Sequence, residues 1–154
     1  MWLPVHADQT ELVERCTQLV RLALPVHQFL DFSTAVAALR SSVARGAPLY
    51  YGLESDFDCC AHYSYMPRRA HWHLCVGFEG SAAPQDVLDL LLSKIDEFAQ
   101  QQQITEMFAV QSKEITYQPL AQLFQLLTTD PRIVRTVVSD EGDALLLKLE
   151  LAAA

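Results

Sequence analysis

The sequence lacks an excess of positive charge, and this lack argues against the most common kind of nucleic-acid-binding protein. Its 11 lysines and arginines are outnumbered by 19 aspartates and glutamates, so the formal net charge at pH 7 is −8. A surface that binds phosphate backbones of any sequence needs the opposite sign. Only Arg68 and Arg69 form a compact basic pair. We therefore expect no general nucleic-acid binding.

The sequence also lacks an apolar run long enough to span a membrane, and it lacks the features of a secretory leader. A membrane-spanning helix needs about 20 consecutive apolar residues. A signal peptide begins with positive charge and continues into an apolar stretch, whereas this chain begins Met-Trp-Leu-Pro-Val. We expect a cytoplasmic protein without membrane contact.

Cysteines are few, and their spacing matches neither a disulfide framework nor a Cys-x-x-Cys motif. The four stand at positions 16, 59, 60 and 75. Free thiols in a reducing compartment are the simplest interpretation.

What the sequence does contain is a large apolar fraction. Hydrophobic residues make up 51% of the 154 positions, and a chain of this length buries roughly 70% of its unfolded surface. No repeat or linker divides it, so we predict a single domain over residues 1–154. The tail at 152–154 is expected to pack within an assembly.

Four segments have apolar residues at helical spacing. Asp8 and Glu11 resemble a capping box at the start of the first segment, and Pro25 is expected to end it. Ser33 is the expected N-cap of the second segment. The predicted helices cover residues 8–24, 33–44, 84–103 and 117–128.

Alternating or aromatic runs predict strands between these helices. Met66 is expected to pair with His71 across a tight loop, which would place Tyr63 opposite Leu74. A one-residue slip would mix apolar with polar side chains. The predicted strands cover residues 2–6, 49–53, 59–65, 71–78, 104–110, 133–138 and 144–151.

The resulting order is one strand, two helices, three strands, a helix, a strand, a helix and two strands. Over nearly the whole chain this order resembles the GCN5-related N-acetyltransferase (GNAT) fold. The opening, residues 2–5 followed by Asp8, is similar to a GNAT start. The resemblance implies an α/β (α+β) fold with a central, mostly antiparallel mixed sheet of about six to seven strands, flanked by about four helices.

The resemblance also locates a cofactor loop. GNAT enzymes hold the pyrophosphate of acetyl-CoA on an Arg/Gln-x-x-Gly-x-Gly/Ala loop, where backbone N–H groups and a helix dipole attract the anion. The matching stretch here, residues 77–84, lacks that spacing. Glu79 would place a negative charge beside the anion, and Pro84 removes one N–H donor. The weak cofactor-binding candidates that remain are Phe78, Gly80, Ser81 and Ala82.

The catalytic residues implied by the family are incomplete. GNAT enzymes often carry a tyrosine general acid on the penultimate helix, but Phe124 lies near that position. Tyr117 could replace it only after a shift of about two helical turns. A glutamate or aspartate often deprotonates the substrate amine, and Glu54, Asp56 and Asp58 border that region. We name Glu54 and Tyr117 as weak catalytic candidates; a solvated turn is the alternative for the acids.

The predicted register also gathers Cys and His side chains on one face. Two thiolates and two imidazoles form the ligand set of a structural zinc site, and the weak candidates are Cys60, His62, His73 and Cys75. A cysteine nucleophile beside a histidine is a second possibility. The alternative to both is inert buried thiols with hydrogen-bonded histidines.

Three functions follow. The preferred one is a non-catalytic GNAT-fold protein without a cofactor that acts through protein–protein contacts, as a structural subunit of a larger assembly or by self-assembly. GNAT-like proteins without this loop occur among virion components of short-tailed phages, so the location would be the cytoplasm, or a virion if a phage encodes the chain. Arg68 and Arg69, near Trp72 and Tyr65, would suit an interface. The alternatives are a divergent acyl-CoA-dependent N-acyltransferase that uses acetyl-CoA, and a metal-binding domain.

Overall fold

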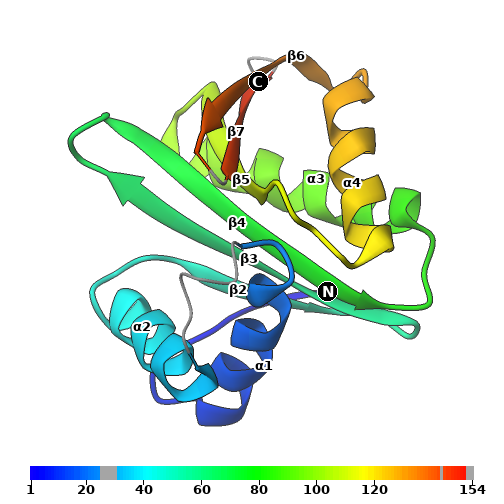
Figure 1. Cartoon of the computed structure of the whole chain (residues 1–154). Coiled ribbons are helices and arrows are strands. Elements are labelled where there is room, and N and C mark those ends of the chain that lie inside the picture. The colour runs from blue at the N-terminus through cyan, green and yellow to red at the C-terminus, as the bar shows by residue number, and fades with distance from the viewer. Residues whose placement is uncertain (25–30, 143, 152–154) are drawn as a thin grey trace.

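The structure, a computed structural model, describes residues 1–24, 31–142 and 144–151. Within those residues it contains seven strands and four helices in the predicted order (Figure 1). The elements are β1 (Trp2–Pro4), α1 (Thr10–Arg21), α2 (Phe32–Ala44), β2 (Leu49–Leu53), β3 (Phe57–Met66), β4 (His71–Gly80), α3 (Pro84–Gln102), β5 (Glu106–Ser112), α4 (Gln118–Thr129), β6 (Ile133–Glu141) and β7 (Ala144–Leu151).

All seven strands form one mixed sheet in the order β1-β2-β3-β4-β5-β7-β6. Every neighbouring pair is antiparallel except β4 and β5, which are parallel. The register predicted for the long hairpin of β3 and β4 is confirmed, since Met66 pairs with His71 and Tyr63 with Leu74. The predicted fold class, an α/β fold with a mostly antiparallel mixed sheet, is confirmed as well.

The larger core lies between the sheet and the helices α3 and α4, which cover one face (Figure 1). Apolar residues recur on α3 every three or four positions, so a single side of the helix faces the sheet. Along each strand, alternate residues point into this core. Its largest fully buried side chains include Tyr63, Phe78, Phe98, Phe124, Leu74, Leu88, Ile95, Met107, Leu120 and Leu123.

A smaller core lies on the opposite face, under α1 and α2. It joins Val13, Cys16 and Leu19 of α1 to Leu49 of β2 and Cys60 of β3. In the part of the chain that the structure describes, no residue of β5, β6 or β7 belongs to this core. The two pairs of helices therefore cover different extents of the sheet.

The starts predicted for the first two helices, α1 and α2, differ from the observed ones. The first helix has Gln9 at its N-cap position without a capping side-chain bond, so the capping box expected from Asp8 is wrong. The second is capped by Asp31, whose carboxylate accepts from the Thr34 N–H at 2.7 Å, and not by Ser33. Aspartate and serine are both good caps, and the sequence pattern could not rank them.

The first helix ends at Arg21, four residues before Pro25, which was expected to end it. Pro25 itself lies outside the described residues, as does the tail at 152–154. Among the helices of the described part, none is long and apolar enough to cross a membrane.

Candidate functional site

The two parallel strands of the sheet separate soon after they meet, and this separation defines the candidate site. β4 and β5 pair only at His73 with Phe108 and at Leu74 with Ala109. Beyond those pairs each strand continues toward its carboxyl end without the other (Figure 1). In sheets of this kind ligands bind in the crevice outside the carboxyl ends of neighbouring parallel strands.

The loop of residues 80–83 lies between β4 and α3, at one side of this crevice. Gly80 has a φ of +148°, and a Cβ atom there would stand 2.3 Å from the Asp56 carbonyl oxygen, so glycine is required. The Ser81 N–H already donates to that oxygen at 2.8 Å. The N–H groups of Ala82 and Ala83 have no partner among the residues described. Together with the Gln85 N–H of the first helical turn, the head of α3 therefore offers three unpaired amides among the residues described.

Three of the four candidate cofactor-binding residues, Phe78, Gly80 and Ala82, are available only through their backbone. The Phe78 side chain is fully buried in the larger core, and Ala82 is buried beside it. Gly80 has no side chain, and the Ser81 hydroxyl turns back toward the Asp56 carbonyl oxygen at 3.4 Å. Any anion at this loop would therefore bind to backbone amides.

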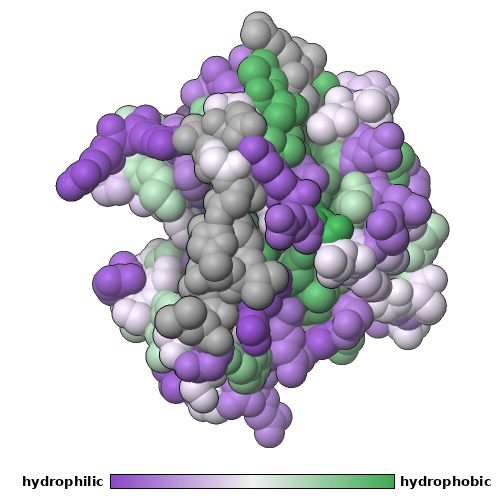
Figure 2. Space-filling view, in the orientation of Figure 1, coloured by the Kyte–Doolittle hydropathy of each residue, from purple (hydrophilic) through white to green (hydrophobic). Residues whose placement is uncertain are grey.

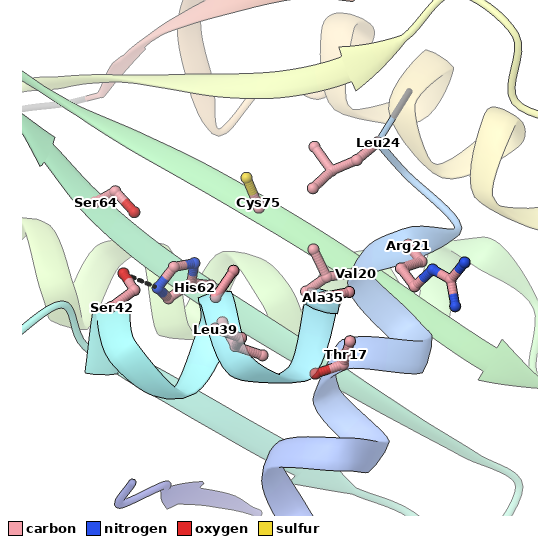
Figure 3. Close-up of a pocket in the computed structure, with 11 residues that line it drawn as sticks. Thr17, Val20, Arg21, Leu24, Ala35, Leu39, Ser42, His62, Ser64 and Cys75 are labelled. Atoms are coloured by element: carbon pink, nitrogen blue, oxygen red, sulfur yellow. Dashed lines mark hydrogen bonds between the residues drawn. The ribbon is translucent and has the colours of Figure 1, made fainter. Parts of the chain in front are cut away.

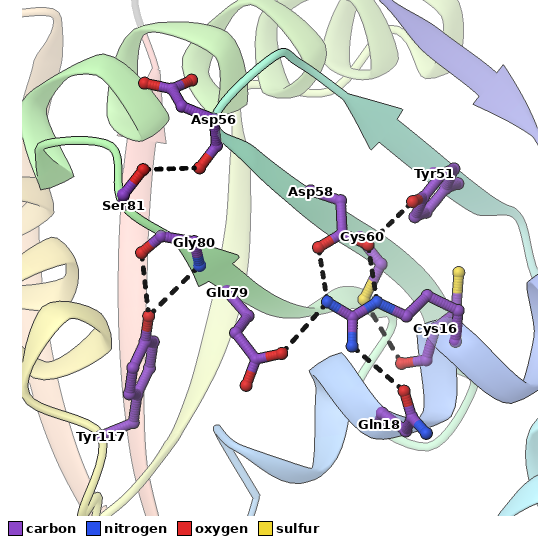
Figure 4. Close-up of polar contacts among 11 residues, drawn as sticks. Cys16, Gln18, Tyr51, Asp56, Asp58, Cys60, Glu79, Gly80, Ser81 and Tyr117 are labelled. Atoms are coloured by element: carbon purple, nitrogen blue, oxygen red, sulfur yellow. Dashed lines mark hydrogen bonds and ion pairs between the residues drawn. The ribbon is translucent and has the colours of Figure 1, made fainter.

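The carboxylate of Glu79 does not point into the loop as the sequence suggested. It accepts a hydrogen bond from Arg15 Nη2 at 3.2 Å. Arg15 also donates two hydrogen bonds of 2.6 Å to the Asp58 carboxylate (Figure 4). Arg15 comes from α1, so this cluster lies on the α1 side of the sheet. Arg15 shares its single positive charge between Asp58 and Glu79, so this pairing reduces but does not cancel the negative charge beside the loop.

Tyr51 completes this polar cluster. Its hydroxyl donates to Asp58 Oδ2 at 2.7 Å, and burial together with this bond raises the pKa of Tyr51 to about 12. Burial alone would raise the pKa of the Asp58 carboxyl, but the bonds from Arg15 and Tyr51 hold that pKa below its ordinary value. The cluster is thus one arginine shared by two carboxylates, with a neutral phenol bound to Asp58. Nothing in the sequence pattern indicated Arg15.

The two catalytic candidates are placed differently. The Tyr117 hydroxyl reaches Gly80, 3.4 Å from its nitrogen and 3.3 Å from its carbonyl oxygen (Figure 4). The Tyr117 ring packs edge-on against Phe78, with 5.9 Å between the ring centroids. Glu54 instead binds the ammonium group of Met1 at 2.8 Å. Tyr117 therefore reaches the loop in the observed register of α4. Glu54 is instead paired with the N-terminus, next to the strand β1.

The crevice itself is filled by the end of α1, which the sequence did not predict. The Ser112 N–H at the end of β5 donates to the Ala23 carbonyl at 2.8 Å. Ala23 is fully buried, and it packs with the core on the α3 and α4 side of the sheet, as does Leu22. The chain leaving α1 thus inserts where β4 and β5 part. Figure 3 shows this segment rising from α1 toward β5, with Leu24 next in sequence.

One glycine permits this insertion. A Cβ atom on Gly77 of β4 would stand 1.9 Å from the Leu19 carbonyl oxygen of α1. The backbone of the helix therefore rests directly on the backbone of the strand, which only glycine allows.

A pocket of about 210 Å³ lies between α1, α2 and the strands β3 and β4 (Figure 3). His62 projects into it, with Nε2 3.3 Å from the Ser42 hydroxyl. Burial lowers the pKa of His62 to about 4 and raises the pKa of Cys75 to about 12. At neutral pH both groups are uncharged, so neither the reactive thiolate nor an imidazolium is present here.

The four metal candidates do not form one centre. His62 lies opposite Cys75, as the register predicted, but His73 places its Nε2 2.8 Å from His71 Nε2. Cys60 is fully buried with its sulfur 3.6 Å from the Cys16 carbonyl oxygen. Over residues 1–24, 31–142 and 144–151, no group of three or more His, Cys, Asp or Glu side chains is placed to hold a metal ion.

Comparison with known proteins identifies the fold. No protein-family model matches the sequence, and no curated protein matches it significantly. Solved structures match nearly the whole chain. An N-acetyltransferase from Staphylococcus aureus Mu50 has a TM-score of 0.59 at 11% identity, covering 98% of this chain and 96% of its own. An acetyltransferase of the GNAT family from Streptococcus pneumoniae has a TM-score of 0.55 at 12% identity, covering 99% of each chain.

A third match is yncA from Salmonella typhimurium, determined with its cofactor acetyl-CoA. Its TM-score is 0.59 at 12% identity, and the match covers 100% of this chain and 95% of that one. The chain therefore has the GNAT fold, as the element order predicted. Likeness at this level of identity shows the fold alone, and function has to be argued from the site.

Proposed function

We propose that this chain is a GNAT-fold protein that does not transfer acyl groups and that acts by binding another protein. The observation that carries the proposal is the buried position of Ala23, between the carboxyl ends of β4 and β5. A coenzyme in a fold of this kind needs that crevice. Here the space is occupied by the protein's own backbone.

The anion-binding loop supports the same conclusion. An anion at a helix N-terminus is held by several amides that point at it. In this chain the Ser81 N–H already donates to Asp56 and Pro84 has no N–H, so the amides of Ala82, Ala83 and Gln85 are left. Two of the five residues at 81–85 therefore contribute no amide to a diphosphate.

The charge of the adjoining surface gives further support. An N-acyltransferase has to accept an amine, which is a cation before it is deprotonated. A groove of about 770 Å³ that opens beside β4 and β5 has Arg68, Arg69 and His73 in its lining and, among the described residues there, no carboxylate. Cations at the mouth of an acceptor site would repel such a substrate.

The decisive experiment is a titration of the purified protein with acetyl-CoA, by calorimetry and by thermal shift. We expect no binding heat and no rise in Tm at about 1 mM ligand, because a ligand that binds only the native state must stabilise it. The Salmonella protein that holds acetyl-CoA is the positive control. A saturable heat, or a Tm rise of several degrees, would refute the proposal.

The assembly in which such a protein would act, a virion for example, stays a prediction. Mass measurement of the purified protein, alone and within particles of its source, tests that part. A chain that remains monomeric and absent from every particle would count against a structural subunit.

A second candidate, the divergent N-acyltransferase, is favoured by one specific observation. The Tyr117 hydroxyl lies beside Gly80 at the mouth of the crevice, where a general acid could meet a departing thiolate. Glu79 is held by Arg15 and does not block the loop. In this case acetyl-CoA would have to displace the end of α1.

Release of free CoA thiol in the presence of amine substrates tests the second candidate. If the chain is an enzyme, Tyr117→Phe should lower turnover by about 100-fold, while acetyl-CoA binding is kept. The control is Tyr65→Phe, since Tyr65 lies far along β3 at the hairpin end. Equal turnover in both variants would remove Tyr117 from any catalytic role.

A further inference from the structure

The open groove of the molecule lies beside the tip of the β3–β4 hairpin, not at the loop before α3. Its volume is about 770 Å³, which is within the range of sites that hold a small ligand or a few residues of peptide. Apolar side chains line most of it, among them Leu24, Val110 and Leu146. Arg68 and Arg69 stand at its rim.

Away from its open end, which carries Asp58 and Glu79, the β3–β4 hairpin is positively charged, whereas the protein as a whole is negative. Residues 59–78 contain both arginines and no aspartate or glutamate, in a chain whose net charge is −8. Arg68 and Arg69 are both exposed. The tip projects from the body at the upper left of Figure 1, and its surface there is hydrophilic in Figure 2.

Arg68 is available to a partner. Within the described residues it makes no hydrogen bond or ion pair, although acidic side chains are plentiful elsewhere in the chain. An exposed guanidinium beside an apolar surface can bind a carboxylate through two parallel hydrogen bonds. The groove thus combines an anion-binding rim with an apolar floor.

We propose that this groove binds a short acidic segment of a partner protein in which apolar side chains separate the carboxylates. The carboxylates would meet Arg68 and Arg69. The apolar side chains would cover Leu24 and Val110, which are partly exposed, whereas Leu146 is buried. This inference rests on the proposed protein-binding function and names the chemistry of the partner. Arginine is one of the residues enriched in interface hot spots.

A nucleic acid would also carry negative charge, but the groove fits it poorly. Phosphate backbones need a basic track that neutralises many charges, whereas here two arginines stand on a protein of net charge −8. The floor is aliphatic, and Leu24, Val110 and Leu146 cannot stack on bases as aromatic rings do. An acidic and apolar peptide satisfies both parts of the groove.

The test uses three labelled peptides and fluorescence anisotropy. The probe is acetyl-Glu-Leu-Asp-Phe-Glu-Leu-amide, one comparison peptide replaces its acids by lysine, and the other replaces its apolar residues by serine. We expect a Kd of about 100 µM for the probe. Binding of either comparison peptide should be at least about tenfold weaker, because each lacks half of the complementarity.

Matched variants locate the binding. Arg68→Glu combined with Arg69→Glu should weaken probe binding by about tenfold or more. The control is Arg45→Glu, which reverses another exposed arginine, at the end of α2, and should change the Kd by less than about twofold. Unchanged thermal unfolding of all variants would show that folding is intact.

Several results would overturn the inference. These are no probe binding up to about 1 mM, equal binding of a comparison peptide, equal loss in the control variant, or tighter binding of a short oligo-deoxythymidine at the same arginines. The outcome is separable from that of the coenzyme titration. Acetyl-CoA binding would end the non-catalytic proposal and leave the groove in place, while failure of the probe peptide would end the groove alone.

Discussion

The two halves of the sheet are built differently. Strands β2, β3 and β4 lie between two cores, with α3 on one face and α1 and α2 on the other. Strands β5, β7 and β6 share only the larger core, and in the described part of the chain no helix joins a core on their other face. The first half is enclosed, and the second keeps one face for the groove.

This difference separates the two functions that the fold could support. The crevice between β4 and β5 lies at the boundary of the two halves. The segment after α1 closes it, where the Ser112 N–H donates to the Ala23 carbonyl oxygen. The open groove falls in the second half, where Val110 and Leu146 lie under an arginine rim. Space is therefore lost at the crevice and kept at the groove.

The largest effect expected from this comparison is on β7, whose neighbouring leucines face opposite sides. Leu147 is fully buried in the larger core, so Leu147→Ala should lower the free energy of unfolding by about 3.5 kcal/mol. Leu146→Ala, on the groove side, should cost about 2.5 kcal/mol, because Leu146 is only 6% exposed but belongs to neither core. Urea unfolding measures both. Equal losses would mean that the groove face is as enclosed as the core.

The next effect concerns the contact of α1 with β4. Gly77→Ala would drive a Cβ atom into the Leu19 carbonyl oxygen and should cost about 3 kcal/mol. Gly46→Ala is the control, since Gly46 has a φ of +101° but open space around it, and should cost about 1 kcal/mol. Urea unfolding compares the two. If Gly77→Ala costs no more than the control, the helix does not rest on the strand.

A third, smaller effect is the pH dependence of the enclosed half. The pKa of His62 is about 4 in the folded protein and about 6.5 in the unfolded chain. As the pH falls, the unfolded chain therefore binds the proton before the folded protein does. The free energy of unfolding is highest above pH 6.5 and decreases as the pH falls from about 6.5 to about 4. Between pH 7 and pH 5 this loss is about 2 kcal/mol.

The measurement is the free energy of unfolding at both pH values for the natural protein and for His62→Asn. The variant should lose about 2 kcal/mol less over that interval, because it has no imidazole to protonate. His71→Asn is the control: its pKa is also lowered, chiefly by burial and by Arg69, but it lies near the surface. Parallel pH profiles for the natural protein and for His62→Asn would contradict the burial of His62.

The smallest expected effect is at the groove rim. Arg68→Glu should change the free energy of unfolding by less than about 0.5 kcal/mol, because Arg68 is exposed and its surroundings hold no partner for it in the described residues. Thermal and urea unfolding measure it. A loss above about 1 kcal/mol would make Arg68 part of the structural framework and remove it as a free contact for a partner.

Most of the fold could be predicted because its signals are local. The alternation of β3 and β4 predicted the pairing of Tyr63 with Leu74, since a slip of one residue would have exposed the apolar side chains. The helical spacing of α3 and α4 predicted which of their residues are buried. Helix starts were less certain, because Asp31 and Ser33 are equally suitable caps and the choice depends on where the chain enters the helix.

The candidate site was predictable only in part. The sequence drew attention to the loop before α3 and to Tyr117, and the structure brings the two together. It gave no indication that Arg15 would take up Glu79, because 64 residues separate the pair. The insertion of Ala23 had no signal either, since alanine after a helix is unremarkable in any sequence.

The pattern of apolar residues alone determined the element order, the register of the central hairpin and hence the GNAT fold. This was possible because buried side chains recur about every 3.6 residues in a helix and every second residue in a strand. Only the tertiary structure decided that the crevice between β4 and β5 is closed and that the groove under Arg68 is open. Both depend on how closely α1 approaches the sheet at Gly77. That approach is set by the packing of side chains and backbone from distant parts of the chain, which no local pattern records.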